Sequence, residues 1–74
     1  MKQRVLSFLS TVPDASATEI GDALGASRPA VGMIVLRLTR AGLLARTFDP
    51  QRGCHYYSLT PRGLARLRFL QRSL

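Results

Sequence analysis

The sequence predicts a mainly helical α+β fold in which three helices precede a β-hairpin and a fourth helix follows it. Three observations predict this order. Apolar residues recur at helical spacing in four segments, and two stretches rich in β-branched, aromatic and aliphatic residues flank the turn-forming segment 49–53. The chain of 74 residues has room for one domain. We therefore treat residues 1–74 as a single domain without repeats or linkers.

The first helix is expected at about residues 2–12. Its apolar residues recur at spacings of three and four, and Pro13 and Asp14 should end it. The residues of its buried stripe are expected to be Val5, Leu6, Leu9 and Val12.

The second helix is expected at about residues 17–24. Ser16 and Glu19 have the spacing of a capping box, in which each side chain satisfies a free backbone donor of the other residue. Gly25 supplies the left-handed residue that commonly ends a helix. The buried side of this helix is expected to consist of Ile20, Ala23 and Leu24.

The third helix is expected at about residues 28–41, after a tight turn of two residues. Ser27 is a suitable N-cap residue, Pro29 is tolerated in a first turn, and Gly42 should end the helix. The apolar residues of its core stripe are Val31, Ile34, Val35 and Leu38.

The hairpin is expected at about residues 43–59 and the fourth helix at about residues 61–73. Alternation in the second strand places His55, Tyr57 and Leu59 on one face, with Tyr57 and Leu59 in the core. The other face of this strand is expected to carry Cys54, Tyr56 and Ser58. Thr60 and Pro61 begin the last helix, whose apolar stripe consists of Leu64, Leu67, Leu70 and Leu74.

This order of elements is that of a winged helix-turn-helix, a three-helix core with a β-hairpin wing and a C-terminal helix. Three stretches resemble the bacterial MarR-like and PadR-like transcriptional regulators: Ile-Gly-Asp-Ala-Leu-Gly-Ala-Ser at 20–27, residues 31–44 ending in Leu-Thr-Arg-Ala-Gly-Leu-Leu, and Tyr-Ser-Leu-Thr-Pro-Arg-Gly at 57–63. The resemblance covers roughly residues 17–67. It implies that the third helix is a DNA recognition helix and that the hairpin clamps the DNA.

Two departures from the resemblance affect what it implies. The larger members of these families carry long additional helices for dimerisation or ligand sensing, whereas this sequence has only its fourth helix. Where such recognition helices often carry Ser, Thr, Gln or Arg, this sequence has Pro29, Ala30, Gly32 and Met33. We therefore expect modest readout of base sequence, through thymine methyl groups and arginine, and no small-molecule effector is evident.

The charge balance favours a polyanionic partner. Eleven Lys and Arg against four Asp and Glu give a formal net charge of +7, and ten of the eleven cations are arginine. Arginine forks match phosphate oxygens and the O6/N7 edge of guanine. High genomic GC content would also enrich arginine without any function, so charge alone leaves both explanations open.

The candidate DNA contacts lie on the third helix and the hairpin. On the helix, or at its start, they are Ser27, Arg28, Pro29, Ala30, Gly32, Met33, Arg37 and Arg40, and on the hairpin they are Arg46 and Arg52. The alternative for these arginines is ordinary solvated charge, and for Arg52 a solubilising turn. We expect the protein to act as a homodimer, which DNA sites commonly require. Its candidate dimerisation residues are Phe8, Leu67, Leu70 and Leu74, although this leucine stripe could instead cover the helical core.

Several function classes find no support in the residues. Cys54 and His55 are the single cysteine and the single histidine, too few for a zinc site, and no catalytic constellation or cofactor motif is present. No apolar run is long enough for a membrane span, and one cysteine fits the reducing bacterial cytoplasm.

The sequence therefore predicts a non-enzymatic protein that binds double-stranded DNA with some sequence preference, as a small transcriptional repressor of bacterial, plasmid or phage origin. Two alternatives remain: a protein-interaction module that docks through Pro29, Met33 and Leu36, and an accessory factor that bends DNA.

Overall fold

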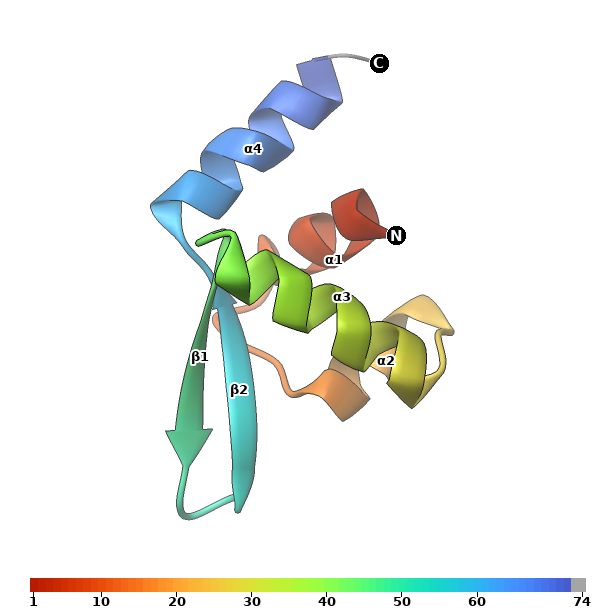
Figure 1. Cartoon of the computed structure of the whole chain (residues 1–74), viewed down its shortest axis with the longest axis vertical. Coiled ribbons are helices and arrows are strands. Elements are labelled where there is room, and N and C mark those ends of the chain that lie inside the picture. The colour runs from red at the N-terminus through yellow and green to blue at the C-terminus, as the bar shows by residue number, and fades with distance from the viewer. Residues whose placement is uncertain (73–74) are drawn as a thin grey trace.

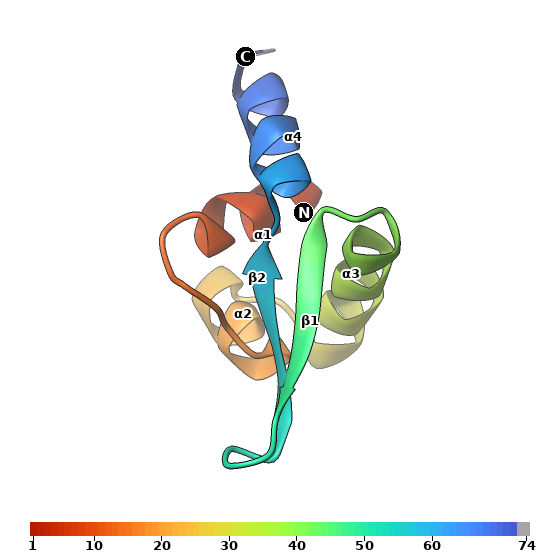
Figure 2. The same cartoon turned by 90° about the vertical axis from the view of Figure 1, so that its left-hand side faces the viewer.

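The computed structural model describes residues 1–72 and contains four helices and one two-stranded sheet. Figure 1 shows the order α1 (Lys2–Leu9), α2 (Ala17–Leu24), α3 (Arg28–Arg40), β1 (Leu44–Asp49), β2 (Cys54–Leu59) and α4 (Pro61–Arg72). The mainly helical α+β fold with a hairpin between the third and fourth helices is thereby confirmed. Figures 1 and 2 show the hairpin projecting from one end of the molecule and α4 extending from the other.

The core takes residues from every helix and from the beginning of the hairpin. Its buried apolar residues are Val5, Leu6, Leu9, Ala15, Ile20, Val31, Val35, Leu38, Leu43, Leu44 and Leu67. Val12, Leu24, Ile34 and Leu70 are half-buried and pack against this cluster. The stripes predicted for the first and third helices are therefore buried or packed against the core, as are Ile20 and Leu24 of the second helix and Leu67 and Leu70 of the fourth.

The prediction that Ala23 lies on the buried side of α2 is wrong. Ala23 is exposed, whereas Gly21 is buried. A Cβ atom at Gly21 would lie 3.0 Å from the Ala26 carbonyl oxygen and 3.5 Å from Val31 Cγ2. The turn into α3 therefore passes directly over Gly21, and the buried face of α2 is turned toward that turn and away from Ala23.

Helix α1 is shorter than its apolar spacing predicts and ends at Leu9. The Ser10 hydroxyl donates to the Ser7 carbonyl at 2.6 Å, and the Thr11 hydroxyl donates to the Phe8 carbonyl at 2.7 Å. The same two carbonyls also accept the backbone N–H groups of Ser10 and Thr11, at 3.2 and 3.0 Å, so the chain closes in tighter turns of three residues instead of continuing the α-helix. Val12 still packs against the core, although it lies beyond the helix.

The segment between α1 and α2 pairs with the hairpin, which the sequence did not predict. Ala15 N donates to the Tyr57 carbonyl at 3.0 Å, and Tyr57 N donates to the Ala15 carbonyl at 2.8 Å. Ala15 itself is 2% exposed. This bridge attaches β2 to the helical core and so fixes where the hairpin stands relative to the helices.

The hairpin is antiparallel, with a register running from Leu44 opposite Leu59 at its base to Asp49 opposite Cys54 at its tip. Tyr57 and Leu59 are half-buried and pack against the core cluster, as expected. His55 shares their face of the strand but is exposed, because it lies farther out along the hairpin than the core reaches.

The joint between the hairpin and α4 is built around Thr60 and Gly63. The Thr60 hydroxyl accepts from Gly63 N at 3.0 Å and donates to the Gly42 carbonyl at 2.7 Å, so it caps α4 and ties it to the end of α3. A Cβ atom at Gly63 would overlap the Leu43 carbonyl oxygen. Only glycine allows α4 to begin this close to the chain that enters β1.

Candidate nucleic-acid interface

Helix α3 is anchored by one face and exposed along the other. Val31, Val35 and Leu38 are buried in the core. The N-cap Ser27 has extended backbone angles, and its hydroxyl accepts from Ala30 N at a long 3.4 Å. The helix therefore has a fixed inner side, which determines the residues on its outer side.

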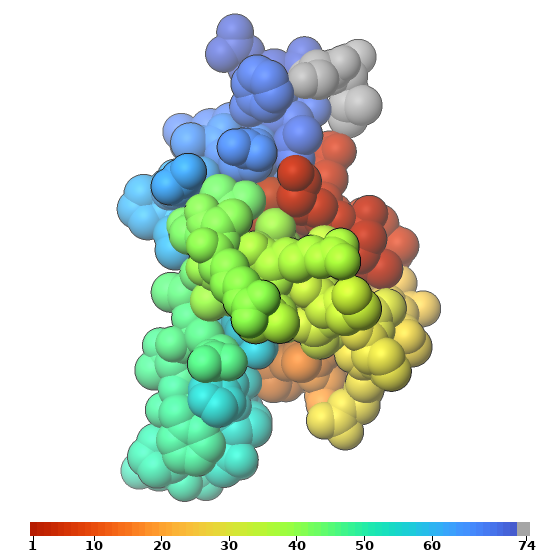
Figure 3. Space-filling view, viewed as in Figure 1, coloured from red at the N-terminus to blue at the C-terminus, as the bar shows by residue number. Residues whose placement is uncertain are grey.

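All eight predicted contact residues on or beside α3 are solvent-exposed: Ser27, Arg28, Pro29, Ala30, Gly32, Met33, Arg37 and Arg40. Leu36, which lies on the same side, is 42% exposed, and Met33 is 58% exposed. Helix α3 contains no acidic residue. Its outer side is thus a continuous surface of small, apolar and cationic residues, and Figure 3 shows this helix lying across one face of the molecule.

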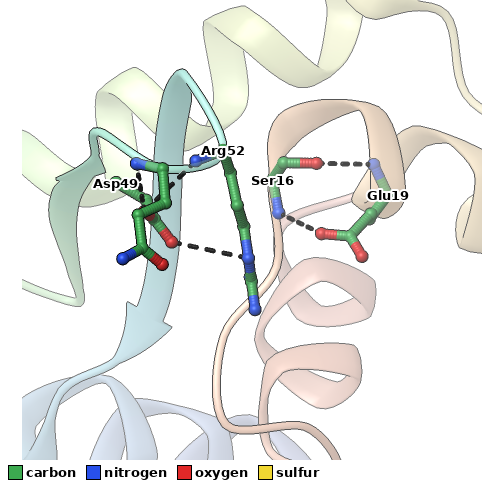
Figure 4. A network of polar contacts seen from close by, with 5 residues as sticks. Ser16, Glu19, Asp49 and Arg52 are labelled. Carbon is green, nitrogen blue, oxygen red and sulfur yellow. Dashed lines mark hydrogen bonds and ion pairs between the residues drawn. The ribbon is translucent and has the colours of Figure 1, made fainter.

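The turn between α2 and α3 sets the angle between these two helices. Gly25 has the left-handed φ of 65° that ends α2, and Ala26 N donates to the Gly21 carbonyl at 3.0 Å. At the other end of α2 the predicted capping box is present, with Ser16 N to Glu19 Oε1 at 2.9 Å and Glu19 N to Ser16 Oγ at 3.2 Å (Figure 4). Both ends of α2 are fixed, and α3 follows in a defined orientation.

The tip of the hairpin holds Arg52 in place. The Asp49 carboxylate accepts from Gln51 N at 2.9 Å and from Arg52 N at 3.3 Å, and its other oxygen lies 3.4 Å from Arg52 Nε (Figure 4). The Arg52 guanidinium also lies over the Tyr56 ring, 4.6 Å from its centroid. Hydrogen bonding to Tyr56 raises the pKa of Arg52 above its ordinary value.

Arg52, predicted as a DNA contact or as part of a solubilising turn, thus has an acidic partner within the turn itself. The Asp49 carboxylate partly neutralises the positive charge of Arg52, although the Arg52 side chain remains 57% exposed. Arg46, the second predicted wing contact, is exposed and pairs across the strands with Tyr57. Among residues 1–72 the Arg52–Asp49 pair is the one ion pair, so Arg46 has no acidic partner there.

A groove of about 470 Å³ separates the hairpin from the first turns of α2 and α3. Arg28 lines it from α3, Thr18 from α2, and Phe48 and His55 from the hairpin. The rings of Phe48 and His55 meet edge to face with centroids 5.2 Å apart. The sequence analysis did not name Thr18, Phe48 or His55 as candidate DNA contacts. These residues come together only in the folded chain, where one side of the hairpin faces the N-terminal ends of α2 and α3.

The predicted dimerisation residues have different surroundings. Leu67 is 3% exposed and belongs to the core of the chain itself, so it presents almost no surface to a second subunit. Phe8 and Leu70 are half-buried and pack against that core, and Leu74 lies outside the described residues. Phe69 is 64% exposed on α4.

Residues 1–72 carry neither a metal-binding cluster nor a membrane-spanning helix. Over this range no three His, Cys, Asp or Glu side chains gather as a metal ion would require. None of the described helices is long and apolar enough to cross a membrane.

Comparison with known proteins agrees with this geometry. The model of the MarR family matches residues 3–53. A crystallised MarR family transcription regulator is 36% identical, with a TM-score of 0.87, over 99% of this chain and 50% of that one. The PcaV transcriptional regulator from Streptomyces coelicolor is 34% identical, with a TM-score of 0.88, over 95% of this chain and 52% of that one.

More distant likeness supports the fold alone. A mutant MarR from E. coli is 22% identical with a TM-score of 0.87, over 96% of this chain and 53% of that one. No curated protein sequence gives a significant match. The chain spans about half the length of the solved relatives that it matches. Because the family model covers well over half of the sequence and the winged helix-turn-helix is present, the chain belongs to the MarR family.

Proposed function

We propose that this chain binds double-stranded DNA as the reading domain of a transcriptional regulator, with α3 in the major groove and the hairpin against the adjacent backbone. The observation that carries the proposal is the outer side of α3, which is exposed over its whole length and free of acid. It carries Arg28, Arg37 and Arg40. Arginine at these positions can bind phosphate or guanine, and nothing on this side repels the DNA backbone.

Gly32 supports close approach of a partner to α3. Glycine inside a helix costs about 1 kcal/mol of stability relative to alanine, yet a Cβ atom at Gly32 would meet nothing within 4 Å. The packing of the chain itself therefore gives no reason for glycine here. A DNA edge pressed against the helix would give one, because it leaves no space for a side chain.

The two wing arginines have different roles in this proposal. Arg46 contacts phosphate, since it is exposed and has no acidic partner among the described residues. Arg52 stiffens the turn through Asp49 and Tyr56 and contributes a partly neutralised charge. Readout of bases by α3 is modest, resting on arginine and on apolar contact of Met33 with thymine methyl groups.

For the whole protein we propose a cytoplasmic repressor that acts as a homodimer on an inverted repeat and performs no enzymatic reaction. Family membership supports this, because the matched relatives are described as transcription regulators. Since Leu67 is buried in the chain itself, pairing of subunits would use the outer surfaces of α1 and α4.

Fluorescence anisotropy with a labelled random-sequence duplex at two salt concentrations tests the DNA-binding proposal. The proteins compared are wild type, Arg28→Ala, Arg37→Ala and the control Arg68→Ala, which removes the same charge from α4. We expect wild-type affinity to fall steeply with salt, because bound arginines release counterions from the DNA. Loss of Arg28 or Arg37 should weaken binding by about fivefold to a hundredfold and flatten the salt slope, while Arg68→Ala should change it little.

Two outcomes would contradict the proposal. Absence of binding at low salt would remove DNA as the partner. An equal effect of Arg68→Ala and Arg37→Ala would mean diffuse attraction without a defined face. Salt-insensitive capture of a protein through Met33 and Leu36 would favour the interaction-module alternative, which the comparisons with known proteins do not favour.

A further inference from the structure

A second group of cations surrounds a cavity at the opposite end of α3 from the wing groove. The cavity has a volume of about 340 Å³ and lies between the start of α1, the last turns of α3 and the start of α4. Lys2, Arg37, Arg62 and Arg66 line it, and the buried Leu38 and Leu43 contribute to its wall. Figure 3 shows these three segments meeting on one face, in red, green and blue.

The charge around this cavity is uncompensated. Four of the eleven cations of the chain line it, and none of the four acids does. The one ion pair within residues 1–72, Arg52 with Asp49, lies at the hairpin tip. Like charges gathered around one hollow repel one another, and an anion in the hollow would be attracted to all four.

The start of α4 adds to this positive potential. Arg62 is the second residue of α4, and no acid lies in the first turn. The N-terminal end of a helix carries partial positive charge, where an arginine is unfavourable and an anion is favourable. Arg62 also crosses the end of α3, since its Cδ and Nη1 atoms lie 3.8 Å from where a Cβ atom of Gly42 would stand.

We infer that this cavity binds a polyvalent phosphate group. A singly charged carboxylate would leave three of the four positive charges unmatched, whereas a phosphate or pyrophosphate carries two or more negative charges. The arginine fork is also the side-chain geometry that holds phosphate oxygens in pairs. The group could belong to a free phosphorylated compound, or two or more neighbouring phosphodiesters of the DNA backbone, each with one negative charge, could supply it together. Both sources present phosphate oxygens to the same arginine forks.

The cavity is distinct from the DNA face but touches it through Arg37, which lines the cavity and belongs to the outer side of α3. The inference does not rest on the proposed function, because phosphate binding can be measured without DNA. Failure of either one therefore leaves the other standing.

Thermal unfolding and calorimetric titration with inorganic pyrophosphate, at ionic strength matched with sodium chloride, test the inference. The variant is Arg62→Gln/Arg66→Gln, and the matched control is Arg68→Gln/Arg72→Gln, which removes two charges from the same helix outside the cavity. We expect pyrophosphate to stabilise wild type and the control alike, and to bind the cavity variant at least about tenfold more weakly. Benzoate at the same ionic strength should stabilise none of them measurably.

A second measurement separates the two sources of phosphate. If the cavity variant loses pyrophosphate binding but keeps the control's DNA affinity, the ligand is a free phosphorylated compound. If it also binds DNA several-fold more weakly than the control, the DNA backbone supplies the phosphate. Equal pyrophosphate binding by both double variants would overturn the inference, and so would stabilisation by benzoate equal to that by pyrophosphate.

Discussion

Gly63→Ala should destabilise this domain even though it places a better helix former inside a helix. The new methyl group would overlap the Leu43 carbonyl oxygen and lie 2.8 Å from Leu59 Cδ1, whereas nonbonded carbon atoms normally keep about 3.5–4.0 Å apart. Relieving this overlap requires moving the start of α4 away from the chain that enters β1. The same movement strains the hydrogen bond from Thr60 N to the Leu43 carbonyl, which measures 3.2 Å.

The magnitude follows from these contacts. Overpacking of this kind costs about 1–3 kcal/mol, and loss of the Thr60 bond adds about 1 kcal/mol. Alanine returns at most about 1 kcal/mol of helix propensity. The net loss is therefore about 2 kcal/mol, and for a domain of this size it lowers Tm by about 8–16 °C.

Urea unfolding followed by far-ultraviolet circular dichroism measures this change, with Gly32→Ala as the matched control. Gly32 is also helical, but a Cβ atom there meets nothing within 4 Å, so the same substitution should stabilise the domain by up to about 1 kcal/mol. Opposite signs at the two glycines are the expected result. A Gly63→Ala midpoint equal to or above that of wild type would refute the packing argument.

Three further outcomes follow from the local contacts. Gly32→Ala, although more stable, should bind DNA more weakly in the anisotropy titration; unchanged affinity would mean that DNA does not approach this turn of α3. Ser16→Ala should lower the free energy of unfolding by about 1 kcal/mol. Ser27→Ala should lower it by less, because the hydrogen bond that caps α3 is longer than the one that caps α2. A larger loss for Ser27→Ala than for Ser16→Ala in urea unfolding would contradict this ranking. Asp49→Ala frees Arg52 and should raise DNA affinity a few-fold at low salt but not at high salt; weaker binding would show that the shape of the turn matters more than its charge.

The sequence by itself determined the elements and most of the core. Helical spacing identifies Val31, Val35 and Leu38, capping chemistry identifies both ends of α2, and a turn segment between two strand-like runs identifies the hairpin. These signals are local, since each depends on residues within one or two turns of the chain. They also suffice to identify the outer side of α3. The residues of a helix that do not belong to its buried stripe lie on its outer face.

Only the tertiary structure decided how distant segments meet. The pairing of Ala15 with Tyr57, the contact of Gly63 with the Leu43 carbonyl, and the commitment of Arg52 to Asp49 and Tyr56 all depend on distances that spacing does not encode. The same is true of the gathering of Lys2 and Arg37 with two arginines of α4 around one cavity. Packing brings such residues together across the chain, and electrostatics and excluded volume act between neighbours in space whatever their separation in sequence.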